Sequence, residues 1–303
     1  MPKILIADDE FEVLEMIKDY FEDYKEFSIL TATSAKQGLG YLESETGIDM
    51  VISDINMPEM KGFEFLKIVK AKYPLVKRLL MTAFNVEEYS ELALEHDAGN
   101  IFVKAVPFDF EEFEILIRKL LSEDIFGPER YFTSDYQSNE YRITSATNIH
   151  NQVKDILQSI RDNDNKLELA LIEMITNAVF YGVKEETAEN RANWDYDFVL
   201  EDEKSVVAKV LLDSEKYAVS ITDPGGKLRK QDVLFWLNRQ TKKDPSGMPY
   251  GLMDNHGRGF FLTRKYIDRL IINIDPQKKT EIIIINYYGN IYKGNKPLYI
   301  NEL

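Results

Sequence analysis

The feature that most constrains the fold is a repeated alternation of short apolar runs with segments of helical period within the first 122 residues. The apolar runs are rich in branched residues, as β-strands are, and they read KILIA, FSILTA, DMVISD, KRLLMTA and NIFVKA. Between them lie amphipathic segments such as EFEVLEMIKDYFEDY, SAKQGLGYLES and KGFEFLKIVKAKY. Strand then helix, repeated five times, predicts an α/β unit with a doubly wound, five-stranded parallel sheet covered by helices on both faces.

Polar side chains follow these strands at the point where each strand ends. Asp8 and Asp9 follow the first run, Asp54 the third, Thr82 the fourth and Lys104 the fifth. Because functional groups of parallel sheets gather at the carboxyl ends of the strands, we expect these side chains to share one crevice. Each of them alone could equally be a helix cap or a turn residue, since Asp and Thr favour both places.

Carboxylates that share a crevice repel one another, and a hard divalent cation such as Mg²⁺ relieves that repulsion through oxygen ligands. A lysine and a hydroxyl nearby can hold the oxygens of a phosphoryl group carried by one of the aspartates. The pattern therefore predicts a magnesium-dependent phosphoryl site in this part of the chain.

At these residues the chain resembles the receiver domain of two-component response regulators, over residues 1–122. The resemblance rests on ADDE at 7–10, DINMPEMKG at 54–62, MTA at 81–83 and Lys104. It implies a flavodoxin-like fold and a sensor histidine kinase as the phosphoryl donor. By position it implies Asp54 as the phosphoacceptor, Asp8, Asp9, Asp54 and the carbonyl of Asn56 as Mg²⁺ ligands, and Thr82 and Lys104 as contacts of the phosphoryl group.

Two departures from the family pattern occur at the fifth strand. The family's Lys-Pro is Lys104-Ala105 here, with Pro107 displaced, and the usual aromatic residue three places before the lysine is Ile101. Phe102 stands one place later, which on an alternating strand points it to the opposite face. The sequence therefore supports phosphorylation more than it supports the family's usual aromatic-switch signalling.

Composition narrows the remaining chemistry. The chain has no cysteine and only three histidines, His96, His150 and His256, which excludes thiolate chemistry and argues against a histidine metal cluster. A net charge of −15 argues against nucleic acid as a partner, because binding to phosphate backbones needs clustered Lys and Arg. No apolar run approaches a membrane span and no signal-peptide profile precedes ILIADDE, so we expect a cytoplasmic protein without a membrane partner.

The acidity is uneven along the chain and changes near a candidate boundary. Residues 1–122 contain 13 of the 37 Lys and Arg but 24 of the 52 Asp and Glu. After the helical segment FEEFEILIRKLLSED, the run IFGPERYFTSDYQSN carries Gly127-Pro128 and no clean period. We therefore predict one domain at 1–122, a linker at 123–130 and a second domain at 131–303.

The second domain carries two polar residues on an otherwise apolar helical segment, NKLELALIEMITNAVFYGV. Its apolar residues, Leu169 and Ile172 among them, predict a broad buried face, while Glu173 and Asn177 lie four apart and stack on one side. A carboxylate and a carboxamide in such a place predict an ion, ligand or water partner. A solvated pair is the alternative.

Further along, two strands joined by a turn at Asp213-Ser214 end in DPGG at 223–226. A strand-end aspartate can accept a hydrogen bond from an exocyclic amine such as adenine N6, and the glycines beside it let a planar ring approach; an ordinary turn is the alternative. A long polar segment with a short apolar helix at DVLFWLN follows, and DNHGRGFFLTRKYID at 254–268 closes it. Its length is typical of a lid, and its glycine pair before a helix permits phosphate binding.

Taken in order, Glu173-x-x-x-Asn177, DPGG and NHGRGFFL resemble the GHKL ATPase superfamily over residues 130–290, and they are most similar to its anti-sigma-factor serine-kinase branch. The resemblance implies an α+β Bergerat sandwich with a mixed or antiparallel sheet, and ATP with Mg²⁺ held between the sheet and a lid. By position it implies Glu173 as general base, Asn177 as Mg²⁺ ligand, Asp223 as adenine contact, Thr280 as a contact near the adenine, and Gly225, Gly226, Gly257, Arg258 and Gly259 around the nucleotide.

This part of the chain also departs from its family. The family's glycine box is Asp-x-Gly-x-Gly, whereas its fifth place here is Lys227, with Gly226 one step early. That change is compatible with adenine binding. Residues 181–204 resemble an insertion relative to the compact anti-sigma kinases, and the sequence suggests no role for them.

Together the resemblances predict a response regulator whose output is an ATP-dependent protein serine/threonine kinase of the partner-switching type. His150 lacks the residues that follow the acceptor in histidine kinases, so Asp54 must receive its phosphoryl group from another protein. The expected partners are a sensor histidine kinase, an anti-sigma-factor antagonist and a sigma factor, and both resemblances are compatible with a homodimer. A nucleotide-gated partner-binding module without kinase turnover is the alternative, and a kinase acting on a receiver through a histidine-bearing partner is a weaker third.

Overall fold

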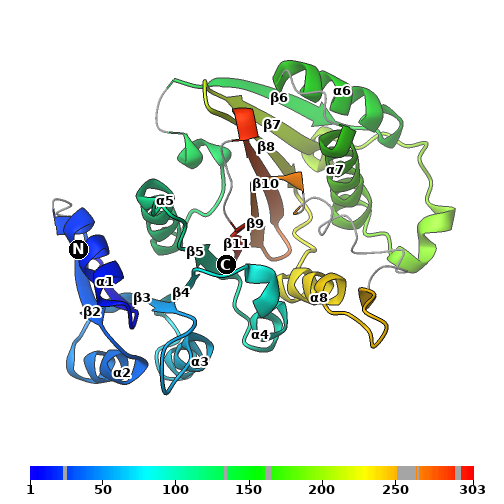
Figure 1. The fold of residues 1–303 in the computed structure, drawn as a ribbon. Coiled ribbons are helices and arrows are strands. Elements are labelled where there is room, and N and C mark those ends of the chain that lie inside the picture. The colour runs from blue at the N-terminus through cyan, green and yellow to red at the C-terminus, as the bar shows by residue number, and fades with distance from the viewer. Residues whose placement is uncertain (23–25, 133–134, 161–164, 251–263, 265, 291–294) are drawn as a thin grey trace. The chain divides into compact units, whose positions relative to one another are not determined.

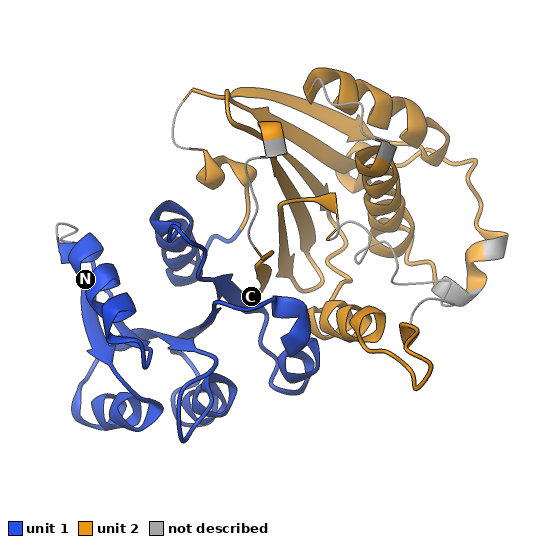
Figure 2. Ribbon diagram, viewed as in Figure 1, with its two compact units in different colours: residues 1–125 blue, residues 126–303 orange. Residues whose placement is uncertain are grey.

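The computed structural model describes residues 1–22, 26–132, 135–160, 165–250, 264, 266–290 and 295–303. The chain divides into two compact units, residues 1–125 and residues 126–303 (Figure 2). Both tryptophans of the chain, Trp194 and Trp236, belong to the second unit, so tryptophan fluorescence reports on that unit alone.

The first unit contains a parallel sheet of five strands in the order β2-β1-β3-β4-β5. The strands are β1 (Lys3–Ala7), β2 (Ser28–Ala32), β3 (Ile48–Asp54), β4 (Lys77–Thr82) and β5 (Asn100–Val103). The middles of β1 and β3 are fully buried, which explains why their runs are apolar without interruption. The predicted α/β unit with a five-stranded parallel sheet is confirmed, and its strand order is that of doubly wound, flavodoxin-like sheets.

Helices cover both faces of this sheet (Figure 1). They are α1 (Phe11–Glu22), α2 (Ala35–Ser44), α3 (Gly62–Lys72), α4 (Ser90–Glu95), which follows the 3₁₀ turn η1 (Val86–Tyr89), and α5 (Phe110–Leu121). On one face α1 and α5 lie side by side, and the rings of Tyr20 and Phe110 stack at 4.3 Å between centroids. On the other face α2 packs against α3.

Several helices of this unit begin at side chains that bond free backbone N–H groups. Ser34 Oγ accepts from the N–H of Gln37 at 3.2 Å before α2, and Asp109 Oδ1 accepts from the N–H of Glu112 at 2.9 Å before α5. The first turn of a helix leaves such groups without intrahelical partners, so these caps fix where the helices start.

The second unit contains a mixed sheet in the order β11-β9-β10-β8-β7-β6. The strands are β6 (Gln137–Ile143), β7 (Val206–Leu212), β8 (Lys216–Asp223), β9 (Arg269–Asp275), β10 (Lys279–Tyr287) and β11 (Leu298–Glu302). Neighbours are antiparallel except β11 and β9, which are parallel. A mixed sheet after the parallel unit is what the sequence predicts; the GHKL form of that sheet stays a prediction.

Helices of the second unit pack on this sheet (Figure 1). They are α6 (Ile149–Ile160), α7 (Asn165–Asn177), which runs on into the π-helical turn η4 (Ala178–Val183), and α8 (Lys230–Thr241). Short 3₁₀ turns are η2 (Pro128–Tyr131), η3 (Ala146–Asn148), η5 (Ala188–Asn193), η6 (Asp202–Lys204) and η8 (Tyr288–Asn290). The helix α6 packs against β6 and β7, and η4 packs against β7 and β8. Within the described ranges, no helix combines the length and apolar character needed to cross a bilayer.

Two sequence-based expectations for this unit are wrong. The buried face of α7 is narrower than predicted, because Leu169 is 49% exposed and Ile172 is only half-buried. The residues of α7 that face the core are spaced three and four apart, and Leu169 and Ile172 lie outside that row. The helix predicted at DVLFWLN is also longer, since α8 extends over Lys230–Thr241, with Gln231 exposed before the predicted stretch and Gln240 buried after it.

Gly62 and Gly40 predict opposite effects of the same substitution. A Cβ at Gly62 would lie 2.1 Å from the carbonyl oxygen of Asp54, whereas a Cβ at Gly40, exposed on α2, would meet nothing within 4 Å. We expect Gly62→Ala to lower the free energy of unfolding by about 1–3 kcal/mol, because packed backbone must shift. Gly40→Ala should raise it by about 0.5–1 kcal/mol through helix propensity.

Urea dependence of hydrogen exchange in peptides from residues 35–82 measures both effects. Equal effects of the two substitutions would contradict the packing of Gly62 on the strand that ends at Asp54.

Candidate functional site

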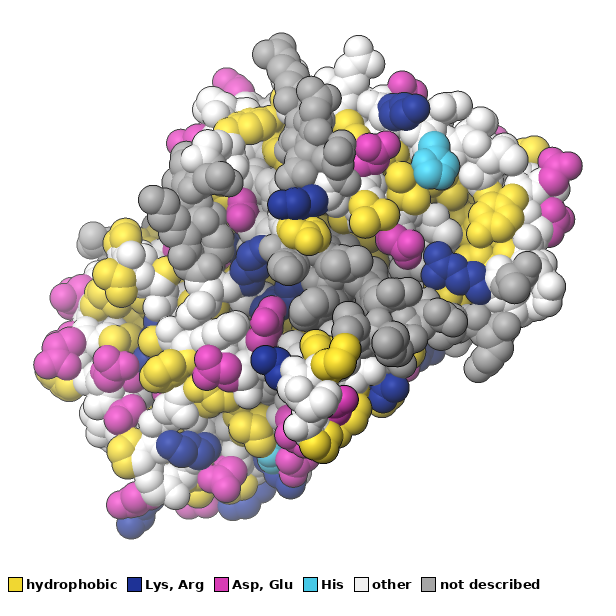
Figure 3. Space-filling model, turned by 45° about the vertical axis from the view of Figure 1, so that its right-hand side comes forward, with side chains coloured by type: hydrophobic (Ala, Val, Ile, Leu, Met, Phe, Trp, Pro, Cys, Tyr) yellow, Lys and Arg dark blue, Asp and Glu magenta, His cyan; other side chains and the backbone are white. Residues whose placement is uncertain are grey.

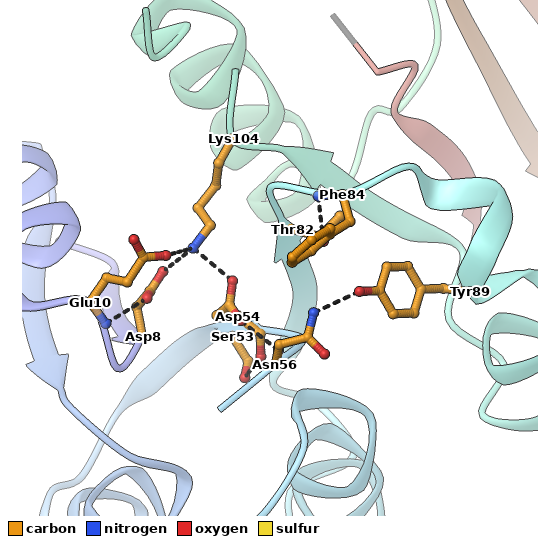
Figure 4. A network of polar contacts seen from close by, with 9 residues as sticks. All are labelled: Asp8, Glu10, Ser53, Asp54, Asn56, Thr82, Phe84, Tyr89 and Lys104. Atoms are coloured by element: carbon orange, nitrogen blue, oxygen red, sulfur yellow. Dashed lines mark hydrogen bonds and ion pairs between the residues drawn. The ribbon is translucent and has the colours of Figure 1, made fainter. Parts of the chain in front are cut away.

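The ammonium group of Lys104 lies among carboxylates at the carboxyl ends of the parallel strands (Figure 4). Its Nζ is 2.8 Å from Asp54 Oδ1, 2.9 Å from Asp8 Oδ2 and 2.9 Å from Glu10 Oε1. Asp8 follows β1, Asp54 ends β3 and Lys104 follows β5. The parallel order of the strands thus brings together groups that are up to 96 positions apart in the chain.

Asp8, Asp54 and Lys104 are buried, whereas Glu10 is exposed. Burial raises the pKa of Asp8, and the nearby charge of Asp54 adds to this, while the N–H of Glu10 and the ammonium of Lys104 partly lower it. Burial alone would lower the pKa of Lys104, but its bonds to Asp54, Glu10 and Asp8 raise it overall. The lysine therefore stays charged, as a buried cation paired with carboxylates should.

The oxygen atoms of this cluster suit a hard divalent cation. Asp8 and Asp54 supply buried carboxylates, Asn56 supplies a carbonyl, and Asp9 is exposed beside them, which is the oxygen-rich donor set that Mg²⁺ prefers. The raised pKa of Asp8 shows that Lys104 only partly offsets the cost of burying this carboxylate. Among the described residues, no group of three acidic or histidine side chains is placed to hold a metal ion by itself, so the Asn56 carbonyl and water would have to complete the shell. Binding of Mg²⁺ here stays a prediction.

Asn56 and Thr82 lie on the other side of Asp54 (Figure 4). The backbone N–H of Asn56 donates to Asp54 Oδ2 at 2.5 Å, and its side-chain Nδ2 donates to the hydroxyl of Tyr89 at 2.6 Å. Thr82 is buried, and its hydroxyl accepts from the N–H of Phe84 at 3.0 Å. The loop after β3 is thereby bonded both to the carboxylate and to the turn before α4.

Two residues of this cluster were not singled out from the sequence. Glu10 is the last letter of the ADDE run, so the motif itself contained the signal. Tyr89 lies 33 positions after Asn56, in a turn with no strand-end pattern. Only the packing of η1 beside the sheet brings its hydroxyl to Asn56.

A second buried carboxylate, Asp223, ends β8 in the second unit. Its Oδ1 accepts from the N–H groups of Gly225 at 3.0 Å and Gly226 at 3.2 Å. Thr280 of β10 lies opposite Asp223 in the antiparallel register. The Thr280 hydroxyl is buried without a well-formed hydrogen bond, yet it is near enough to favour the ionised carboxylate. The structure thus brings together residues predicted for the adenine end of an ATP site.

Glycines make the close packing around Asp223 possible. A Cβ at Gly182, in η4, would lie 2.6 Å from Asp223 Cγ, and a Cβ at Gly225 would lie 1.8 Å from the carbonyl oxygen of Gly182. Gly226 has a φ of +57°, and a Cβ there would lie 2.5 Å from the carbonyl oxygen of Asp275. Backbone therefore packs on backbone at this strand end, which only glycine allows. Gly182 was not predicted to belong to the site, although it lies near the end of the predicted helical segment NKLELALIEMITNAVFYGV.

Glu173 lies on α7, four residues before Asn177, and both side chains are half-buried. Its Oε1 is 3.5 Å from Nη2 of Arg191, which comes from the 181–204 segment. The guanidinium of Arg191 lies 5.4 Å from the ring of Trp194, and that ring stacks on Phe180 at 4.3 Å with 7° between the planes. The segment with no role in the sequence is thus anchored on the helix and places a cation beside the predicted general base.

Gly257, Arg258 and Gly259 lie outside the described residues, so their predicted phosphate contacts stay predictions. The end of the same segment is described. Arg264 is buried and donates to the carbonyl oxygens of Pro297 at 2.5 Å and Lys296 at 2.6 Å. These bonds join Arg264 to the chain that leads into β11.

Acidic and basic side chains are interspersed over the described surface in Figure 3. Hydrophobic side chains lie singly or in small groups between them. Mixed charges of this kind are typical of hydrated protein surfaces.

Asp223 predicts a pH dependence of stability for the second unit. Burial raises its pKa from the ordinary 3.8 to about 6, although the N–H groups of Gly225 and Gly226 and the hydroxyl of Thr280 lower it. The folded state therefore holds the proton more tightly than the unfolded state, so the stability contributed by Asp223 falls as pH rises from about 4 to about 6. At pH 7 the ionised Asp223 lowers the free energy of unfolding by about 3 kcal/mol relative to its protonated form at low pH.

We expect the free energy of unfolding of Asp223→Asn, relative to wild type, to rise by about that amount across this pH window. Denaturant unfolding followed by tryptophan fluorescence at several pH values measures the difference. A difference that stays constant from pH 4 to pH 7 would contradict the raised pKa.

Comparison with known proteins concerns the first unit. The family model described as the response regulator receiver domain matches residues 4–118. Response regulator SaeR of Staphylococcus aureus strain USA300 is 31% identical over 122 residues, which are 40% of this chain and 51% of that protein. SaeR of strain MRSA252 gives the same values. The chain thus spans about half the length of the curated relatives it matches.

Two solved structures resemble the same portion of the chain. A response regulator receiver domain protein from Clostridium thermocellum is 29% identical, with a TM-score of 0.36, and the match covers 40% of this chain and 94% of that one. The chemotaxis response regulator CheY4 of Vibrio cholerae is 28% identical, with a TM-score of 0.36, and the match covers 40% and 98%. The family match and the sequence identity to SaeR lead to one conclusion: residues 4–118 form a response regulator receiver domain.

Proposed function

We propose that the first unit is a phosphoryl acceptor that a sensor histidine kinase phosphorylates on Asp54. The observation that supports this most is the contact of 2.8 Å between Lys104 Nζ and Asp54 Oδ1, beside the buried carboxylate of Asp8. A phosphoryl group adds negative charge at this place, and a fixed ammonium group stabilises that charge without reorganisation.

In the proposed reaction an oxygen of Asp54 attacks the phosphorus of a phosphohistidine. A P–O bond forms while the P–N bond breaks, and the imidazole leaves with the electron pair and takes up a proton from water. Lys104 neutralises charge on the phosphoryl oxygens, and the Thr82 hydroxyl, at the end of the neighbouring strand, would donate to them. Asp8, Asp9 and the Asn56 carbonyl are the groups that would hold Mg²⁺, which supplies further charge neutralisation when bound.

For the second unit we propose an ATP-binding domain that acts as a protein serine/threonine kinase in a partner-switching pathway, with an anti-sigma-factor antagonist and a sigma factor as partners. The buried Asp223 at the end of β8 supports this proposal, because an ionised carboxylate can accept a hydrogen bond from an exocyclic amine. Asn177 is the last residue of α7, and by the resemblance to the GHKL superfamily its carboxamide oxygen is the group that would hold Mg²⁺.

In the proposed kinase reaction the hydroxyl oxygen of a target serine or threonine attacks the γ-phosphorus of ATP. The new O–P bond forms, the bond from the γ-phosphorus to the bridging oxygen breaks, and ADP leaves. Glu173 takes the proton of the attacking hydroxyl.

A nucleotide-gated binding module without kinase turnover is a second candidate, and Arg191 favours it. Its guanidinium lies 3.5 Å from the Glu173 oxygen that a hydroxyl would have to reach, so the two compete for the same acceptor. In that case ATP would order the lid for partner capture and stay intact.

Asp54→Asn tests the receiver function. We expect this substitution to abolish labelling by radioactive acetyl phosphate in Mg²⁺, because an amide oxygen does not form the acyl phosphate. Asp19→Asn, exposed on α1, is the matched control and should be labelled like wild type. The measurement is the amount of radioactive label on the full chain that hydroxylamine removes, since hydroxylamine cleaves acyl phosphates. Wild-type labelling of the Asp54→Asn protein would place the acceptor elsewhere.

Glu173→Gln distinguishes the two candidates for the second unit. If Glu173 is the general base, transfer of γ-phosphate from labelled ATP to a co-purifying partner should fall by about 10²-fold or more, with little change in ATP affinity by titration calorimetry. Glu168→Gln, on the same helix, is the control and should leave transfer unchanged. Transfer that persists in Glu173→Gln refutes the base assignment. ATP that binds wild type but stays intact with every captured partner favours the binding module.

A further inference from the structure

A chain of two hydrogen bonds joins the proposed phosphoacceptor to the turn before α4 (Figure 4). The N–H of Asn56 donates to Asp54 Oδ2 at 2.5 Å, and Nδ2 of the same residue donates to the Tyr89 hydroxyl at 2.6 Å. Both distances are short for N–H···O bonds, so neither pair of atoms can move apart far without losing its hydrogen bond. A displacement of Asn56 must therefore be followed by Tyr89 or break the second bond.

Tyr89 is placed to pass such a displacement to α4. It is the last residue of η1 and directly precedes Ser90, the first residue of α4. Val86 at the start of η1 and Ala93 within α4 are buried, so this short segment is held in the core at both ends. The Tyr89 ring itself is half-buried, and its centroid lies 6.2 Å from that of Phe63 on α3.

The aromatic and aliphatic side chains of β5 form no comparable chain of hydrogen bonds. Ile101 and Phe102 of β5 are fully buried, and the Phe102 ring packs on Phe108 and Phe113 at 5.3 and 5.0 Å between centroids. These side chains have no polar atom to bond to the phosphorylation loop, and their packing in the core restricts rotation. The hydroxyl of Tyr89, by contrast, is bonded to the side chain of Asn56.

We propose that Tyr89 is a positioning residue that couples the state of Asp54 to η1 and α4. This inference rests on the proposed phosphorylation of Asp54. When one carboxylate oxygen becomes part of an acyl phosphate, the group loses the delocalised charge that made Oδ2 a strong acceptor, so the bond from the Asn56 N–H weakens. Asn56 then shifts toward the new oxygen positions, and its bond to Tyr89 moves the turn with it.

Tyr89→Phe removes the hydroxyl and keeps the ring. The measurement is amide hydrogen exchange of peptides spanning residues 84–96 in the full chain with Mg²⁺, before and after phosphorylation by acetyl phosphate, with labelling of Asp54 followed in the same samples. In wild type we expect phosphorylation to change exchange in these peptides by about twofold or more. In Tyr89→Phe we expect this change to disappear while Asp54 is still labelled.

Tyr41→Phe is the matched control, since Tyr41 is a half-buried tyrosine on α2 whose hydroxyl accepts from Nε2 of Gln37, on the same helix, at 3.5 Å. It should behave as wild type. A change in exchange that persists in Tyr89→Phe overturns the proposal, and so does a labelled wild type without any change at residues 84–96. If wild type is not labelled, the proposed phosphorylation of Asp54 is wrong, and the proposed coupling is then wrong as well. The labelling assay detects this outcome separately from the exchange measurement.

Discussion

The contact of Lys104 with Asp8 and Asp54 is the interaction on which the receiver unit depends. Each of these groups is buried, and each would be costly in isolation, so the sheet can only close around them when the ammonium and the carboxylates meet. Their meeting requires β1, β3 and β5 to be parallel and in register, because each group stands at a strand's carboxyl end. Stability and phosphoryl chemistry are thus linked: the groups that satisfy one another in the folded chain are the groups that would receive a phosphoryl group.

The second unit also buries a carboxylate, but it stabilises this group without a cation. Asp223 is buried at the end of β8, and backbone N–H groups of a glycine turn take the place that Lys104 has in the first unit. Backbone donors stabilise the charge less completely, and burial consequently raises the pKa of Asp223 to about 6. The arrangement leaves a buried carboxylate at a strand end, beside glycine backbone and the Thr280 hydroxyl, and this carboxylate supports the proposal of a nucleotide site.

Local patterns in the sequence were sufficient to predict the parallel unit, because strand–helix alternation and strand-end polar residues are encoded within short windows. Asp8, Asp54 and Lys104 follow from that pattern directly. Contacts between distant segments were not predictable in this way: nothing near Tyr89 indicates Asn56 as its partner, and nothing in 181–204 indicates that Arg191 reaches Glu173. Leu169 shows the related limit, since an apolar residue beside a helical stripe can face either core or solvent and only the packing of α7 decides.

Taken together, the two proposed functions imply that the state of Asp54 changes nucleotide binding in the second unit. Titration calorimetry of ATP with Mg²⁺ into the full chain, with and without beryllofluoride as a phosphoryl mimic at Asp54, tests it most directly. The account predicts that beryllofluoride changes the affinity for ATP and that ATP changes the affinity for beryllofluoride by the same factor, since coupling between two sites is reciprocal. Measurable ATP binding with one and the same affinity in both conditions would contradict it.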